Sequence, residues 1–248
     1  MAYNYQSNIC FPRLEEKRDN LNKERIERVP LPVYSKREEF LNSLTHAVGA
    51  VFALGALIAC VAVSSYARYK AGLITGIVYG LSMLMLYVNS SVYHGLPKSD
   101  AKKVMRVVDH CTILIFIVGA YAPLILTGIR EQNPRLSVGV FIAVSAAAIV
   151  GIVFTAIDVH RFRALSMASY LIIGWCFALI AKWALKVYPT RFTILLFIGG
   201  ALLTIGAVLY GIGKKNHDYF HAVFHVFILA GSAVHFIAIL QYCMVPRV

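Results

Sequence analysis

Long apolar stretches, each separated from the next by a few polar residues, dominate the chain from about residue 44 onward. Seven of them reach the length of about 20 residues that a helix needs to cross a bilayer. We expect these helices at about 44–66, 71–93, 106–127, 136–157, 164–186, 192–212 and 219–243. Because the connections are short, consecutive helices are expected to be antiparallel neighbours. The pattern therefore predicts an all-α fold, a seven-transmembrane helix bundle spanning residues 44–243.

Residues 1–43 differ from the rest of the chain, since they are polar and carry charges of both signs. Such a segment buries little apolar surface, so it is expected to be a solvated, partly disordered tail. The alternative is a short surface helix in the same segment. Asn42 or Ser43 is the expected cap of the first span. No apolar core followed by a small-residue cleavage site is present, so we expect no cleaved signal peptide.

The composition is typical of a membrane protein and limits the kinds of partner that we expect. Of the 248 residues, 59% are hydrophobic and only 15% are charged, and the mean hydropathy is +0.68. A net charge of +12 would suggest nucleic acid as the partner of a soluble protein, but here the basic residues mostly flank apolar spans. No nucleic-acid partner is expected. The five cysteines are scattered without a CxxC pair, which argues against a disulfide framework or a cysteine metal site.

The distribution of lysine and arginine predicts the orientation of the bundle. If the N-terminus is cytoplasmic, sixteen of these residues lie on the inner side and eight on the outer side. Cytoplasmic segments carry the excess of basic residues in most membrane proteins, so we expect the N-terminus inside and the C-terminus outside. The tail alone creates this difference, because the remaining connections contribute equally to both sides.

Three histidines and one aspartate occupy helix ends that the antiparallel order brings to the same side of the membrane. His94 ends the second span, Asp109 begins the third, and His221 and His225 begin the seventh. The last two are four residues apart, so they lie one above the other on one helix face. Polar groups of this kind are costly in a bilayer and are usually functional there. Three imidazoles that leave a fourth position open are typical of catalytic zinc, which predicts a Zn²⁺ site near the cytoplasmic end.

Asp109 and Ser90 are the expected catalytic residues beside this zinc. Zinc lowers the pKa of a bound water to about 7, so hydroxide is available at neutral pH. Asp109 is placed to hold that water and move its proton as a general base and acid, and Ser90 lies four residues before His94 on the same helix face. The simpler alternatives are an ion pair between Asp109 and Arg106, and a Ser90 hydroxyl bonded to a carbonyl of its own helix.

The other histidines are weaker candidates for metal ligands. His217 continues the spacing of His221 and His225 by one turn and is a rival ligand, although it lies beside two lysines. His110 and His46 are expected to support the ligands rather than bind the metal. His235 lies about 15 Å deeper along its helix than His225 by helix rise, so we expect an interior polar contact. His160 is expected to be solvated.

Small residues and one proline predict local features of the spans. Gly49, Gly55 and the alanines around them are small enough for a neighbouring helix to approach the first span closely. Pro123 is expected to kink the third span and to free a carbonyl.

Four ordered motifs carry a resemblance to a known family. They are Asn42-x-x-Thr45-His46-x-x-Gly49, Ser90-x-x-x-His94, Asp109-His110-x-x-Ile113 with Gly119-x-Tyr121-x-Pro123, and His221-x-x-x-His225 with His235-Phe236. Over about residues 40–243 the chain resembles the hemolysin III and progestin/adipoQ receptor family of seven-helix membrane proteins. Its compact loops look most like the bacterial hemolysin III branch, which implies a multi-pass protein of the bacterial inner membrane.

The resemblance implies the roles of five residues. His94, His221 and His225 would bind zinc, Asp109 would reach it through water, and Ser90 would accompany them. It also implies membership in a wider superfamily of membrane hydrolases that includes alkaline ceramidases. The expected function is therefore zinc-dependent hydrolysis of an amide or ester bond in a lipid that arrives from the bilayer. The alternatives are a receptor that senses a bilayer ligand and holds a structural zinc, and a membrane-lytic or pore-forming protein.

Overall fold

The helices of the chain begin and end where local caps and breakers place them. A computed structural model describes residues 10–213 and 219–246, and no strand occurs in these ranges. The helices are α1 (Cys10–Glu27), α2 (Lys36–Tyr66), α3 (Lys70–Gly95), α4 (Asp100–Leu124), the π-helical turn η1 (Ile125–Ile129), α5 (Arg130–Gln132), α6 (Pro134–Ile157), α7 (Arg163–Trp175), α8 (Phe177–Val187), α9 (Thr190–Gly213) and α10 (Phe220–Cys243).

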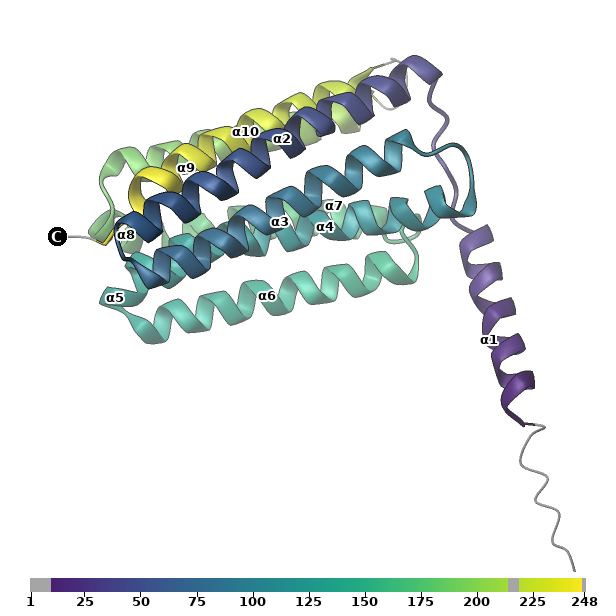
Figure 1. Ribbon diagram of the computed structural model, residues 1–248, viewed down its shortest axis with the longest axis horizontal. Helices are drawn as coiled ribbons and strands as arrows, with labels where there is room; N and C mark the ends of the chain where they lie inside the picture. Colours follow the sequence, from purple (N-terminus) through teal and green to yellow (C-terminus); the bar gives the residue numbers. More distant parts are fainter. Residues whose placement is uncertain (1–9, 214–218, 247–248) are drawn as a thin grey trace, which may run out of the picture.

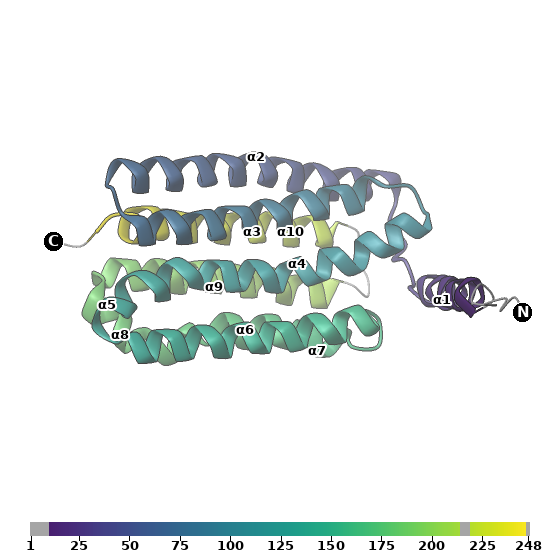
Figure 2. The ribbon, with the colours of Figure 1, turned by 60° about the horizontal axis from the view of Figure 1, so that its bottom comes forward.

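Seven spans run back and forth through the bundle, as the sequence predicts. The helical stretch from Asp100 to Gln132 forms one span and the stretch from Arg163 to Val187 forms another; α2, α3, α6, α9 and α10 are the remaining five. The spans follow one another around the bundle, and α10 returns to pack against α2 (Figure 2). The helix α1 projects from one end (Figure 1). We call this end, where α2, α4 and α10 begin and α3 stops, the histidine end.

The first span begins earlier than its hydropathy suggests. Ser35 caps α2: its hydroxyl accepts from the Glu38 backbone N–H at 3.2 Å, and the Glu38 carboxylate accepts from the Ser35 N–H at 2.8 Å. This reciprocal capping box satisfies two backbone donors of the first turn. The prediction of Asn42 or Ser43 as the cap is therefore wrong, and residues 36–43 of the predicted tail are helical.

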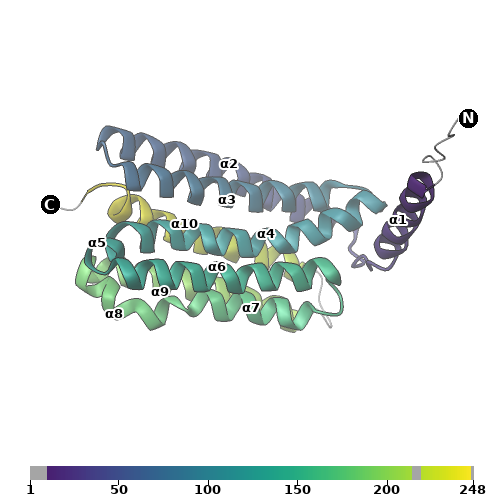
Figure 3. The same ribbon diagram turned by 90° about the horizontal axis from the view of Figure 1, so that it is seen from below.

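The predicted tail also contains α1, which agrees with the alternative of a surface helix rather than with the expected disorder of this part. The described side chains of this helix are mostly exposed, which agrees with its high charge. Part of α1 lies against the start of α4 (Figure 3).

The connection between α3 and α4 is shorter than the one predicted between residues 93 and 106. Ser99 caps α4 by accepting from the Lys102 backbone N–H at 3.2 Å, so the helix begins at Asp100. Lys102 and Arg106 consequently lie inside α4, and both are buried, with 3% and 5% of their surface exposed. They are part of the packed structure rather than of a solvated loop.

The chain beyond Pro123 forms a π-helical turn. Thr127 Oγ1 donates to the Pro123 carbonyl at 2.5 Å and Tyr188 Oη donates to the Leu124 carbonyl at 3.0 Å. Proline removes a backbone donor from the helix, and these hydroxyls satisfy carbonyls in the distorted region. Pro123 itself lies inside α4, and η1 begins two residues later, so the kink expected at Pro123 stays a prediction. A second interruption, at Cys176 between α7 and α8, was not predicted.

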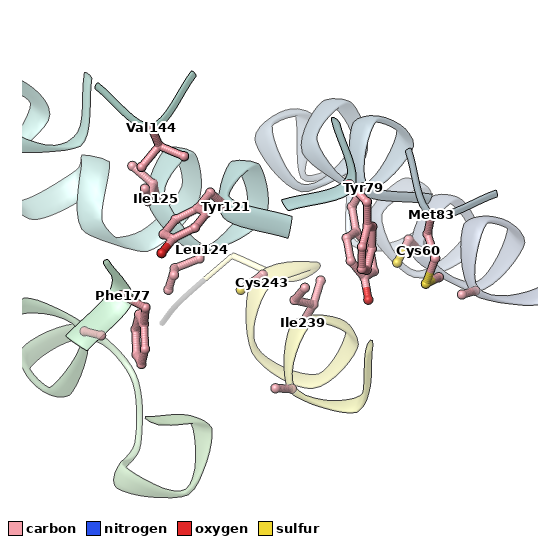
Figure 4. Packing of buried hydrophobic residues seen from close by; sticks show 14 of the residues in the cluster. Cys60, Tyr79, Met83, Tyr121, Leu124, Ile125, Val144, Phe177, Ile239 and Cys243 are labelled. Carbon is pink, nitrogen blue, oxygen red and sulfur yellow. The ribbon is translucent and has the colours of Figure 1, made fainter. Parts of the chain in front are cut away.

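Close packing is concentrated on α3 and α4, which lie in the middle of the bundle (Figure 3). A Cβ atom on Gly49 of α2 would collide with the ring of Tyr87 on α3, as the small-residue pattern predicts. Gly55 faces open space instead. At the end opposite the histidines, an apolar cluster joins α2, α3 and α10 through residues such as Cys60, Tyr79 and Ile239 (Figure 4).

Candidate metal centre

Three imidazoles converge at the histidine end. His94 belongs to the last turns of α3, while His221 and His225 belong to the first two turns of α10. One nitrogen of each ring lies within 4.8 Å of the others, and Nε2 of His94 is 3.0 Å from Nε2 of His221. The sequence prediction that these three residues meet is confirmed. They are a group that could hold one metal ion.

The hydrogen bonds around the rings favour coordination through Nε2. Nδ1 of His94 is 2.8 Å from the Glu39 carboxylate, and Nδ1 of His225 is 3.1 Å from Thr45 Oγ1 and 3.2 Å from the Asn42 carbonyl. A proton on Nδ1 can satisfy these acceptors, which leaves an Nε2 lone pair. The Nε2 lone pair of His94 then points at His221, an arrangement that a cation stabilises. The donor set fits zinc.

Asp109 and Ser90 lie together beside the histidines. The Asp109 carboxyl is buried in α4, and Ser90 of α3 lines the same cavity. Among the described residues Asp109 forms no ion pair with Arg106, whose guanidinium instead donates to the Pro30 carbonyl. Ser90, Asp109, His221 and His225 line one cavity. The arrangement can position a polar molecule next to both the carboxyl and the imidazoles.

Of the remaining described histidines, His46 lies against the group, whereas His110 and His235 contact backbone carbonyls. The His46 ring lies 3.7 Å from the His225 ring between centroids, and Nδ1 of His110 is 2.8 Å from the Arg106 carbonyl. Nε2 of His235 lies 3.1 Å from the Leu196 carbonyl.

 His235 thus makes the interior polar contact that its depth in α10 predicts. His160 is exposed, as expected, and the rival ligand His217 lies outside the described residues.

Two contributors to the site were missed at the level of sequence, Glu39 and Lys102. Both were assigned to polar segments outside the spans. The S-x-x-E pattern at Ser35 and Glu38 is a helix-start signal, and it would have placed Glu39 on α2. Glu39 precedes Asn42 by three residues and His46 by seven, so all three share one helix face.

A cavity of about 210 Å³ leads away from the site into the bundle. Most of its polar residues lie at the histidine end, His235 lies deeper, and most of the remaining lining is apolar. On α9 the lining extends from Tyr210 to Leu196, which corresponds to about 20 Å of helix rise. Trp175, which also lines the cavity, is 36% exposed on the bundle surface. The cavity has the length and character to hold a lipid chain.

The segment before α2 covers the histidine end of this cavity. The Tyr34 ring stacks on the His221 ring at 5.4 Å between centroids and lies 5.9 Å from the His94 ring. Burial raises the pKa of the Tyr34 phenol above its usual range, so its hydroxyl is neutral. Together with the bond from Arg106 to Pro30, Tyr34 holds the segment against the site.

These features define a class of protein, a multi-pass membrane protein of seven helices with a possible three-histidine metal site at one end. Comparison with known proteins gives the family. The family model described as Haemolysin-III related matches residues 34–236, so the chain belongs to the haemolysin III family. The resemblance inferred from the four motifs is confirmed, and a location in a bacterial inner membrane fits this membership.

Three relatives illustrate the range of the similarity. The chain is 31% identical over 212 residues to "Hemolysin-3 homolog" of Bacillus subtilis (strain 168), covering 86% of this chain and 97% of that protein. It is 31% identical over 208 residues to "Hemolysin-3" of Bacillus cereus, covering 84% and 93%. It is 29% identical over 179 residues to human "Monocyte to macrophage differentiation factor", covering 68% and 70%. No solved structure matches the chain significantly.

Proposed function

We propose that this protein is a zinc-dependent hydrolase of amide or ester bonds in membrane lipids. The observation that carries the proposal is the convergence of His94, His221 and His225 within 4.8 Å at the polar end of an apolar cavity. Asp109 and Ser90 line the same cavity. A three-histidine donor set beside a buried carboxyl is suited to hydrolysis, because it combines a metal ligand set with a group that can move protons.

The residues of the chain have distinct roles in this proposal. His94, His221 and His225 would hold the zinc, which supplies Lewis acidity to the scissile carbonyl and to water. Asp109 accepts a proton from the attacking water on a carboxylate oxygen and later delivers it to the leaving amine or alcohol. Ser90, which lines the same cavity, would orient the Asp109 carboxyl or stabilise the oxyanion.

The surroundings of the site support a lipid as the substrate. The Tyr34 segment covers the histidine end, whereas the apolar cavity reaches Trp175 on the side of the bundle. A substrate with a long acyl chain can therefore lie in the cavity with its polar bond at the histidines. The lipid would arrive from the bilayer rather than from solution.

The orientation of the chain is part of the proposal. The excess of lysine and arginine in the N-terminal tail favours a cytoplasmic N-terminus, which would put the histidine end on the cytoplasmic side. A tag at each terminus, probed with a protease in sealed vesicles, tests this. Accessibility of the C-terminal tag from the cytoplasmic side would contradict it.

The test of the function is metal content and turnover measured on the same detergent-purified samples. The variants are His94→Ala, His221→Ala, His225→Ala and Asp109→Asn, with the exposed His160→Ala as the matched control. We expect zinc near one per chain in the wild type and the control, and its loss from each of the three ligand variants. Asp109→Asn is expected to retain zinc while hydrolysis of a ceramide-like amide falls about 10²–10⁴-fold.

Two outcomes would contradict the proposal. Absence of metal from the wild type would contradict the proposed zinc site. Zinc-loaded protein that leaves every tested lipid amide and ester intact would contradict the proposed hydrolase activity. The second outcome would favour a receptor with a structural zinc. The contact between Tyr34 and His221 is the observation that favours this alternative, because it joins the site to the N-terminal segment.

A further inference from the structure

A partly buried ion pair lies beside His94 and involves two residues with no role in the hydrolytic proposal. Glu39 Oε2 is 2.8 Å from His94 Nδ1, and Glu39 Oε1 is 2.8 Å from Lys102 Nζ. Lys102 also donates to the His94 carbonyl at 3.3 Å and to the Leu96 carbonyl at 2.8 Å. The three residues come from α2, α3 and α4, so this cluster joins three helices at one imidazole.

The geometry points to Glu39 as a positioning residue for the metal ligand His94, held in place by Lys102; this inference rests on the proposed zinc site. An ionised carboxylate only accepts hydrogen bonds, so His94 must carry its proton on Nδ1. Nε2 is then unprotonated and directed at His221, 3.0 Å away. A carboxylate on the far nitrogen of a metal-binding histidine fixes the tautomer and ring orientation and raises the basicity of the ligand.

Lys102 completes the arrangement because it neutralises the carboxylate. The Lys102 side chain is 4% exposed and that of Glu39 is 22% exposed. Charges removed from water in this way are stable only when they are paired and hydrogen-bonded. The two carbonyls that Lys102 contacts belong to the end of α3, so the ammonium also satisfies backbone acceptors that the helix end leaves open. Lys102 thereby ties the position of Glu39 to the backbone of His94.

The alternative is an ion pair that only stabilises the fold. The two roles predict different measurements, since a purely structural pair affects thermal stability and not the affinity for zinc. The exposed ion pair between Asp100 and Lys103, with 2.9 Å between Nζ and Oδ1, is a matched control. It joins a carboxylate and a lysine at the same end of the bundle and has no contact with a histidine among the described residues.

The test is zinc affinity of the full-length, detergent-purified protein, measured by competition with a chromogenic chelator. We expect Glu39→Ala to weaken zinc binding about 10–100-fold. Glu39→Gln, which keeps an acceptor oxygen, is expected to give a smaller loss, as is Lys102→Met. Asp100→Ala is expected to bind zinc like the wild type. Visible absorption of the cobalt-substituted protein should change in Glu39→Ala, because the ligand field depends on how the His94 ring is held.

Each result decides between the inferences. Wild-type zinc affinity in both Glu39→Ala and Glu39→Gln would overturn the positioning role, and the proposed zinc site would remain. If the zinc affinity is unchanged in Lys102→Met alone, Lys102 has no part in positioning His94. If Glu39→Ala does not fold, Glu39→Gln provides the measurement. Failure of the wild type to bind zinc would overturn the proposed function itself, together with this inference.

Discussion

The two central helices α3 and α4 are packed more tightly than α7, α8 and α9, which form the far wall of the cavity. In the span containing α4, 67% of the apolar window is buried inside the protein, and in α3 the share is 50%. In the span of α7 and α8 and in α9 it is 22%, and in α2 and α10, which also carry residues of the site, it is 28%. The polar side chains that support the site histidines come from α2 and α4, namely Glu39, Thr45 and Lys102.

The difference indicates which parts of the bundle must be rigid. A metal site depends on ligand positions fixed by packing and by outer hydrogen bonds. A cavity wall for a flexible lipid chain needs an apolar surface of the right shape and few fixed polar contacts. We therefore expect substitutions at tightly packed positions of α3 and α4 to act on stability, and substitutions at positions of α9 that line the cavity to act on its use.

The largest effect on stability is expected at Gly119 of α4. A Cβ atom there would lie 2.7 Å from Ser82 Cβ on α3, an atom that a change of rotamer cannot move. Gly119→Ala should therefore destabilise the protein by about 1–3 kcal/mol. Gly139→Ala in α6 is the control, since a Cβ there meets nothing within 4 Å. Thermal unfolding in detergent measures both, and equal melting temperatures for the two variants would contradict the proposed difference in packing.

A smaller and more selective effect is expected in the cavity. Ala207 of α9 lines it, so Ala207→Phe should fill part of the space next to the site. We expect about tenfold slower hydrolysis of a long-chain lipid, equivalent to about 1.4 kcal/mol, with unchanged zinc content. Ile205→Phe, on the exposed face of the same helix, is the control. Unchanged turnover in Ala207→Phe would show that the substrate does not use this cavity.

The smallest effect is expected in the connection between α6 and α7. Asp158 Oδ1 accepts from the Arg161 and His160 backbone N–H groups at 2.8 and 2.9 Å, and these bonds hold the pKa of its carboxyl below the usual range. The stabilisation is present above the ordinary aspartate pKa and is lost as the pH falls through the lowered value.

Asp158→Ala should therefore cost well under ~1 kcal/mol near neutral pH, because the group is exposed. The difference in melting temperature from the wild type should shrink as the solution is acidified. A difference that grows with acidification would contradict this assignment.

Sequence patterns predicted the spans better than their ends. Hydropathy located all seven spans because a bilayer requires long apolar helices. It could not locate the start of α2, since Glu38 and Glu39 belong to the span although they are charged, and only the capping box at Ser35 marks the boundary. The same limitation placed Lys102 in a loop. The break at Cys176 left no signal, because neither proline nor glycine occurs at that position.

The sequence by itself determined the class of fold and the meeting of His94, His221 and His225. Antiparallel order and a spacing of four residues bring these rings to one end, whatever the details of packing. Only the tertiary structure decided which groups support the rings. Glu39, Thr45 and Lys102 reach the histidines across helix boundaries, and such contacts depend on helix rotation and depth, which side-chain packing between neighbouring helices sets.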